Sequence, residues 1–340
     1  MPDSLPLSAL LGIFAIAAAA VWFAGIYLSD ATDALAARFG LGEALGGMIL
    51  LAIVTNLPEI AIVASASARG AMEVAVGNIL GGIALQTVVL AALDVVGLGR
   101  AAPLTYRAES PSLVLEGALV VAVLALTIIG HHMPEQLIVA RMTPAALLIA
   151  AFWIAGLYVI GETRRRFGNS DDDNRPHPNG HGTTYHALVF AAGALVTLAA
   201  GVALEVSGEH IAARLHMGGA LFGATVLAAA TALPEVSTGL ESMRLKDYRM
   251  AVSDIFGGNA FLPVLFLMAT LLSGQAVLPN AKPTDLYLTG LGILLTVVYI
   301  AGLVIRPQRQ LWRMGLDSFV VVLLYALGIL GLFFMHPDGG

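Results

Sequence analysis

Two glutamates occur within apolar segments of this chain, in nearly the same short context. Glu59 ends the run TNLPE, and Glu235, 176 positions later, ends the run TALPE. A carboxylate inside an apolar membrane helix is costly enough to indicate a functional site by default. The Leu-Pro step before each acid interrupts the helix and frees backbone carbonyls. Two acids beside two broken helices predict a cation-binding site.

The composition indicates what kind of structure must position these acids. The chain is 58% hydrophobic and 12% charged, with a mean hydropathy of +0.85, whereas soluble domains carry about 25% charged residues. Its apolar residues form blocks of about 20, the length of a membrane span. We therefore predict an all-α membrane protein whose partners are the lipid bilayer and cations. The net charge of −6 argues against a nucleic-acid partner, and the absence of cysteine excludes disulfides and thiolate metal sites.

About ten transmembrane helices are expected, five in residues 1–161 and five in residues 185–340, joined by a polar linker at 162–184. The expected spans are Leu7–Leu28, Ala44–Ala68, Met72–Leu98, Ser112–Gly130, Thr143–Gly161, Tyr185–Val206, Met217–Met243, Tyr248–Ser273, Thr284–Ile305 and Leu316–His336.

The distribution of basic residues predicts the orientation of these spans. Thirteen of the seventeen lysines and arginines fall in the loops on one side, which includes the linker. Cytoplasmic loops carry such an excess, so both termini are expected outside the inner membrane of the cell. The first span could also be a cleaved signal peptide. However, Asp3 and the absence of Lys or Arg before that span are unlike one.

A shift of 176 residues aligns the two halves without a gap over about 65 residues. Ala36-Ala37-Arg38 falls on Ala212-Ala213-Arg214, and Gly81-Gly82 falls on Gly257-Gly258. Because each half has an odd number of spans, the second half must enter the membrane inverted. Inverted repeats with interrupted helices at matching positions indicate a secondary transporter. A duplicated structural bundle is the alternative, but it would not need a glutamate in both halves.

These motifs resemble the calcium/cation antiporter family, which includes the sodium/calcium exchangers. In that family each repeat reads G-T-S-L-P-E, followed about 18 residues later by G-N-x-x-G-S-N-I-F-N or D. This chain has TNLPE with GNILGGIALQ, and TALPE with SDIFGGNAFL. The glutamate lies 19 positions before Asn78 in one repeat and 19 before Asp254 in the other. The resemblance covers about Leu41–Ala92 and Met217–Ala269, together with the ten-span layout.

The resemblance implies that Glu59, Glu235, Thr55 and Thr231 line the ion site. Independently of it, calcium prefers six to eight oxygen ligands from carboxylates, carbonyls and water. Two glutamates would balance the charge of a divalent ion, and carbonyls freed near the two prolines would add neutral oxygens. Each threonine could instead bond to its own helix backbone.

The chain departs from the family pattern at the positions that supply oxygens to sodium. The serine before Leu-Pro-Glu is replaced by Asn56 and Ala232, the second serine by Gly82 and Gly258, and the downstream Asn or Asp by Gln86 and Leu262. Four of these six residues offer no side-chain ligand, which weakens the case for sodium coupling.

Polar residues nearby could compensate. Asp254 stands where the family has asparagine, and it shares a helix face with positions 258 and 262. Asn78 and Gln86 occupy the equivalent face of the third span, and Asn259 completes the predicted polar set. A third carboxylate beside two others would favour a bound proton, which suits a proton-coupled carrier. Alternatively, Asp254 only caps a helix near the cytoplasmic surface.

We therefore expect a secondary antiporter that exports Ca²⁺ or another divalent cation in exchange for Na⁺ or H⁺, with no cofactor and no covalent chemistry. A divalent-cation channel using the same acids and a proton-coupled exchanger for another metal remain alternatives. An intramembrane metallohydrolase is disfavoured because the chain has no HExxH motif. Glu116 and Asp317 fall at predicted span ends, where we expect them to reach water.

Overall fold

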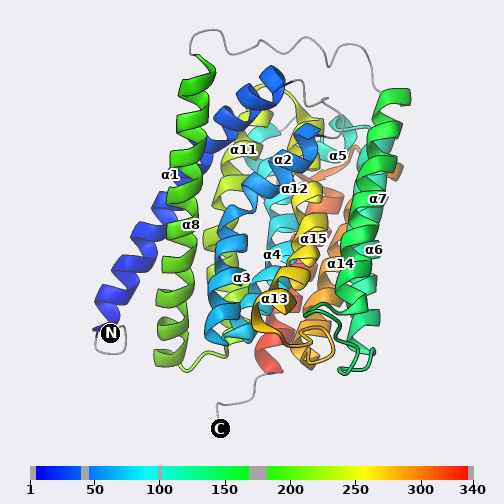
Figure 1. The fold of residues 1–340 in the computed structure, drawn as a ribbon. Helices are drawn as coiled ribbons and strands as arrows, with labels where there is room; N and C mark the ends of the chain where they lie inside the picture. The colour runs from blue at the N-terminus through cyan, green and yellow to red at the C-terminus, as the bar shows by residue number, and fades with distance from the viewer. Residues whose placement is uncertain (1–4, 40–45, 99–101, 168–181, 336–340) are drawn as a thin grey trace.

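The computed structural model describes residues 5–39, 46–98, 102–167 and 182–335. Within these ranges the protein is an almost entirely helical bundle (Figure 1). Ala44, His336 and most of the predicted linker lie outside the described residues. The linker is therefore represented only by its two ends.

The first half of the chain contains the following elements: α1 (Leu7–Phe39), α2 (Gly46–Thr55), α3 (Leu57–Arg69), α4 (Met72–Leu93), the π-helical η2 (Asp94–Leu98), α5 (Leu104–Arg107), α6 (Pro111–His131) and α7 (Pro144–Phe167). The second half contains α8 (Thr183–Arg214), α9 (Gly219–Phe222), the π-helical η4 (Gly223–Leu227), α10 (Ala228–Thr231), α11 (Leu233–Arg244), α12 (Tyr248–Phe261), the 3-10 helix η5 (Leu262–Val264), α13 (Leu265–Ser273), α14 (Pro283–Ile305) and α15 (Leu316–Phe334). A hairpin of β1 (Gln310–Leu311) and β2 (Met314–Gly315) precedes α15.

Eight helical segments of the described residues are long and apolar enough to cross a membrane. A ninth is counted if the bent pair Gly219–Thr231 and Leu233–Arg244, which meet at 42°, forms one span. The remaining expected span, Ala44–Ala68, is represented by α2 and α3, and its first residues are not among those described. The count of ten therefore stays a prediction.

The first described helix starts, and the last described helix ends, at the same end of the bundle (Figure 1). The start of α1 and the end of α15 lie together at the lower end, while the end of α7 and the start of α8 lie at the upper end. The α11–α12 turn lies at the upper end and the α3–α4 turn at the lower end. These two positions are called here the α11–α12 end and the α3–α4 end, and they lie at opposite ends of the bundle.

Two expected spans end earlier than the helices of the structure, and a third, Tyr248–Ser273, has the expected bounds but an internal break. The expected span Tyr185–Val206 was too short, because α8 continues to Arg214 and its polar residue Glu205 bonds to a neighbouring helix. The first helix likewise runs beyond Leu28 to Phe39. The expected continuous span Tyr248–Ser273 contains the 3-10 turn η5, because Pro263 cannot donate to an α-helical hydrogen bond.

Glycines let α4 contact the first part of the broken helix in the second half almost backbone to backbone. A Cβ at Gly77 would lie 2.7 Å from the Ala220 carbonyl oxygen, and one at Gly223 would lie 2.8 Å from the Val74 carbonyl oxygen. Gly81 packs equally closely on Ala224. No side chain fits in these contacts. The two halves of the sequence therefore interlock at the centre of the bundle, where α4 lies.

Candidate functional site

Both glutamates lie in the first turn of a helix that begins directly after a break. Asn56 separates α2 from α3, and Ala232 separates α10 from α11. Proline is the second residue of each new helix, where its missing N–H group is tolerated. The positive end of the helix dipole favours a carboxylate in this turn. The sequence thus places Glu59 and Glu235 at matching helix N-termini inside the bundle.

The two glutamates are buried and are joined by one side chain. Glu59 is 0% exposed and Glu235 is 1% exposed. Gln86, from α4, directs its Nε2 atom at both, 3.4 Å from Glu59 Oε1 and 3.2 Å from Glu235 Oε1. One amide group therefore donates to carboxylates that come from different halves of the chain. The structure brings together the two glutamates of the predicted cation site and places Gln86 between them.

Several oxygen atoms around this amide lack a hydrogen-bond donor. The buried side-chain oxygens without a partner are Asn56 Oδ1, Glu59 Oε2, Gln86 Oε1, Glu235 Oε2 and Asn259 Oδ1. Buried acceptors are almost always satisfied in folded proteins, and leaving one unpaired costs about 1–3 kcal/mol. A bound cation would satisfy such oxygens, because its ligands are acceptors. One donor of the same polar set, Asn78 Nδ2, also lacks a partner.

Asn56 occupies the space that the second repeat leaves open. A Cβ at Gly258 would lie 3.1 Å from Asn56 Nδ2 and 3.7 Å from Gln86 Oε1. The Asn56 amide also donates to the Ala52 carbonyl at 2.7 Å, which fixes its position. Asparagine in one repeat thus faces glycine in the other, both at positions where the family pattern has serine. The sequence alone could not show that these two departures are neighbours.

The threonines before the two Leu-Pro steps have different surroundings. Thr231 Oγ1 lies 3.2 Å from the Ala228 carbonyl oxygen of its own helix and 3.5 Å from Asn78 Oδ1. Its side chain also contacts Glu59. Thr55 is buried and its Oγ1 lies 3.4 Å from Asn56 Nδ2. Thr231 therefore links the second repeat to two polar residues of the first, while it also bonds to its own backbone.

Asn259 and Asp254 lie on α12 at different depths. Asn259 is fully buried, and its Nδ2 donates to Thr87 Oγ1 at 3.1 Å on α4. Asp254 is 8% exposed and accepts a hydrogen bond of 2.5 Å from Thr238 Oγ1. Asp254 does not cap α12, because the N-cap is Asp247. Among the described residues no three His, Cys, Asp or Glu side chains are grouped closely enough to hold a metal ion, so the three acids do not form one compact cluster.

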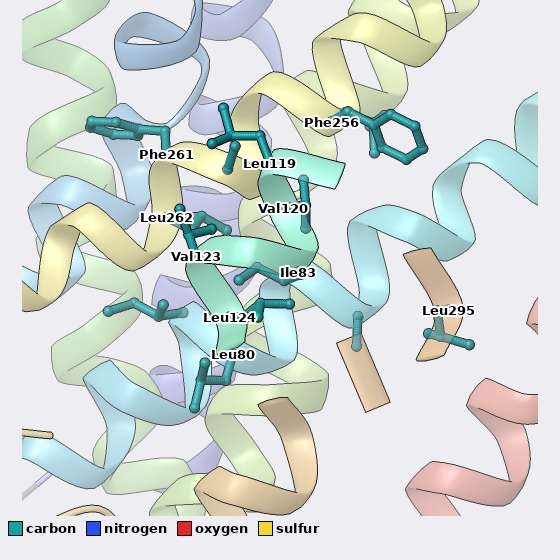
Figure 2. Close-up of a cluster of buried hydrophobic side chains, with 14 of the residues drawn as sticks. Leu80, Ile83, Leu119, Val120, Val123, Leu124, Phe256, Phe261, Leu262 and Leu295 are labelled. Atoms are coloured by element: carbon teal, nitrogen blue, oxygen red, sulfur yellow. The ribbon is translucent and has the colours of Figure 1, made fainter. Parts of the chain in front are cut away.

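Leu262, which stands where the family pattern has Asn or Asp, has an apolar side chain in apolar surroundings. Leu262 is fully buried and packs in the hydrophobic cluster that includes Ile83 and Val123 (Figure 2). Its Cδ1 atom lies 3.6 Å from where a Cβ of Gly82 would be. The side chains of Leu262, Ile83 and Val123 offer no oxygen or nitrogen atom to an ion. The polar site therefore ends at Gln86 and Asn259 on this side.

A small cavity lies beside both helix breaks. Its volume is about 10 Å³, and it is lined by Gly25, Leu28, Ser29, Val54, Thr55, Pro58, Thr197 and Pro234. These residues come from α1, α2, α3, α8 and α11. The pair α1 and α8 nevertheless packs directly on the broken helices, since a Cβ at Gly25 would lie 3.0 Å from Pro234 Cβ and one at Gly201 would lie 2.8 Å from the Pro58 carbonyl oxygen.

Sequence analysis missed several polar partners of the membrane acids. Glu116 and Asp317 were expected to reach water, but both are buried. Glu116 Oε1 instead forms an ion pair of 2.7 Å with Arg164 Nη2, and Arg164 also donates to Ser253 at 2.6 Å. For Glu116 the expectation was wrong because a tertiary partner, which sequence position does not reveal, replaces water. The Asp317 carboxylate is buried without a hydrogen-bond partner among the described residues. Thr238, one turn after Glu235, could have been found from its i+3 spacing.

Comparison with known protein families establishes the family to which this chain belongs. The sequence model described as sodium/calcium exchanger protein matches residues 9–161 and 185–334. The chain belongs to this family. An antiporter named CaxA from Alkalimonas amylolytica is 25% identical over 269 residues, which cover 76% of this chain and 78% of that protein. The inner membrane protein YrbG of Escherichia coli (strain K12) is 25% identical over 270 residues, covering 76% and 80% of the two chains.

Solved structures show the same fold. The H⁺/Ca²⁺ exchanger CAX superposes with a TM-score of 0.69 at 13% identity, covering 97% of this chain and 82% of that one. A structure of the sodium-calcium exchanger NCX_Mj superposes with a TM-score of 0.65 at 15% identity, covering 96% and 100% of the two chains. The protein is an integral membrane transporter of the exchanger fold rather than an enzyme.

Proposed function

We propose that this exchanger carries Ca²⁺, or another divalent cation, across the membrane in exchange for Na⁺ or H⁺. The observation that supports it most is the pair of buried carboxylates at two helix breaks, joined through Gln86 and surrounded by acceptor oxygens without donors. Two carboxylates balance a divalent charge, and amide and carboxylate oxygens are the ligands that Ca²⁺ prefers. The transported ion is a substrate, and no resident cofactor is proposed.

Strict antiport requires that the empty carrier not change its open side readily. Without a cation, two carboxylates would face each other in the membrane interior with only one amide between them. That state is unfavourable because buried charge is costly. An empty carrier would therefore change its open side slowly, and an ion taken across in one direction would be needed for the return.

Counterflow distinguishes this carrier from a channel. Proteoliposomes loaded with unlabelled Ca²⁺ and diluted into a trace of labelled Ca²⁺ should accumulate the label transiently above its external concentration. With the membrane potential clamped at zero, this happens because outward movement of unlabelled Ca²⁺ through the saturable site drives inward exchange of the label. Under the same clamp a channel would only equilibrate the label. Equilibration without overshoot, at any internal Ca²⁺ concentration, would support the channel alternative.

We also propose that the linker is cytoplasmic and that both termini are outside the inner membrane. The excess of lysine and arginine in one set of loops supports this orientation. The described ends of α7 and α8 that flank the linker lie opposite the start of α1 and the end of α15 (Figure 1).

Labelling of introduced cysteines tests the orientation, since the chain has none of its own. In intact cells an impermeant thiol reagent should label Gln136→Cys, in the loop between α6 and α7, and leave Asn179→Cys in the linker unlabelled. Permeabilised cells should show labelling of both. The opposite pattern in intact cells would reverse the orientation.

A further inference from the structure

Asp254 and Thr238 form a hydrogen-bonded pair next to Glu235, on one side of the central site. Thr238 Oγ1 donates to Asp254 Oδ2 at 2.5 Å and also lies 3.3 Å from the Glu235 carbonyl oxygen. Asp254 is close enough to Glu235 for their charges to interact. The pair therefore holds a third carboxylate in a fixed direction beside the buried acid.

This pair lies between the site and the α11–α12 end. Thr238 follows Glu235 by three residues, about 4.5 Å along α11 in the direction of the turn. Asp254 precedes the fully buried Asn259 by five residues, about 7.5 Å nearer to the start of α12. An ion reaching Glu235 from the α11–α12 end would thus pass the Asp254 carboxylate first.

The opposite approach has no equivalent acid. In the 176-residue repeat, Asp254 corresponds to Asn78 and Thr238 corresponds to Ile62. Asn78 is fully buried and uncharged, and its Oδ1 faces Thr231 Oγ1. Ile62 is fully buried in an apolar cluster with Val74 and Phe222. Within the described residues, the two approaches to one site therefore differ in charge at matching positions.

We propose that Asp254, oriented by Thr238, is a capture site for divalent cations that serves only the α11–α12 end. An ion that enters from that end contacts the Asp254 carboxylate first and then passes to Glu235. Asp254 is thus a third carboxylate, in addition to Glu59 and Glu235, that contributes to binding from this end. The charge and number of oxygen ligands set the affinity for such cations. The exchanger therefore binds its divalent substrate more tightly from the α11–α12 end than from the α3–α4 end. This inference rests on the proposed exchange of divalent cations.

The test is the apparent affinity for Ca²⁺ measured separately from each side of proteoliposomes. Single cysteines, Gln136→Cys for one end and Arg249→Cys for the other, allow an impermeant thiol reagent to identify how the molecules are oriented. The protein with no substitution in the transport site should have a lower KM for Ca²⁺ at the α11–α12 end than at the α3–α4 end. Asp254→Asn should raise that KM about 10- to 100-fold, the range seen when an outer-shell partner of a metal is lost, with a much smaller change at the other end.

Four further variants separate capture from a structural role. Asp254→Glu should restore most of the affinity at the α11–α12 end. Asn78→Asp should lower the KM at the α3–α4 end, and combining it with Asp254→Asn should reverse the asymmetry. Glu241→Gln removes an equal charge from the same end of α11, but Glu241 is exposed and paired with Arg244, so both KM values should be unchanged.

Two results would overturn the inference. One is an equal change of KM at both ends in Asp254→Asn, which would make Asp254 part of the common site or of the scaffold. The other is equal affinity from both ends in the unaltered protein. Absence of divalent flux in the unaltered protein would instead refute the proposed function, and this inference with it.

Discussion

Replacing either Glu59 or Glu235 by glutamine is expected to abolish divalent-cation transport while the protein still inserts and folds. Glutamine keeps the size of the side chain but removes one negative charge. A divalent ion would then carry an uncompensated charge in the membrane interior, which is strongly unfavourable. Because loss of an outer-shell partner of a metal already costs about 10- to 100-fold in affinity, loss of a direct ligand should reduce Ca²⁺ flux by more than about 100-fold.

Glu205→Gln is the matched control for this experiment. Glu205 is another fully buried glutamate of the bundle, but it lies on α8, accepts from Ser65 Oγ at 2.7 Å and lies near Arg69. Its variant should retain Ca²⁺ flux. Proteoliposome flux and size-exclusion profiles of all three variants give the comparison. Wild-type rates in both Glu59→Gln and Glu235→Gln would show that the two-carboxylate site is wrong.

The second large effect concerns the driving ion. We expect an imposed pH gradient to drive Ca²⁺ flux in proteoliposomes without any sodium, because Na⁺ would find few ligands. Gly82 and Gly258 have no side chain, Ala232 is apolar, and Leu262 lies in the hydrophobic cluster of Figure 2. A proton needs only a carboxylate, and the carboxylates that would bind Ca²⁺ must release protons to do so. Competition for Glu59 and Glu235 would couple the two ions directly.

The measurement compares a pH gradient without sodium and a sodium gradient at equal pH on each side. Flux should follow the first gradient and show little response to the second. Asp254→Asn should alter the pH dependence of this flux, because a carboxylate next to Glu235 is removed. Ca²⁺ flux that requires sodium and ignores pH would contradict proton coupling, and would mean that backbone oxygens and water replace the absent serines.

The breaks in the two helices could be predicted because they are encoded locally. Leu-Pro-Glu follows a threonine and one further residue in both repeats, and proline ends a helix wherever it occurs in the interior. The family likewise follows from short motifs at fixed spacing. The burial of the two glutamates could be expected from the apolar segments that precede them, although Ser237 and Thr238 follow Glu235.

The contacts across the site could not be predicted because they depend on how helices cross. Gln86 lies 27 residues from Glu59 and 149 from Glu235, so no periodic pattern connects the three. The π-helical segments η2 and η4 also leave no signal in hydropathy. Glu116 and Asp317 were placed near water because charge at a span end usually reaches it, whereas Arg164 reaches into the bundle to meet Glu116.

The interlock of the two halves at the glycines of α4 has a consequence for how the molecule is made. Synthesis proceeds from the N-terminus, and earlier segments can fold first. Glu59 is therefore inserted before Thr231 and Glu235 exist, and the glycine face of α4 must wait for Ala220 and Ala224. Until the second half is inserted, Glu59 and the glycine face of α4 lack the residues that cover them in the complete protein. The site is thus among the last parts of the molecule to form, and a ribosome that stops after α7 leaves a membrane fragment with half of it.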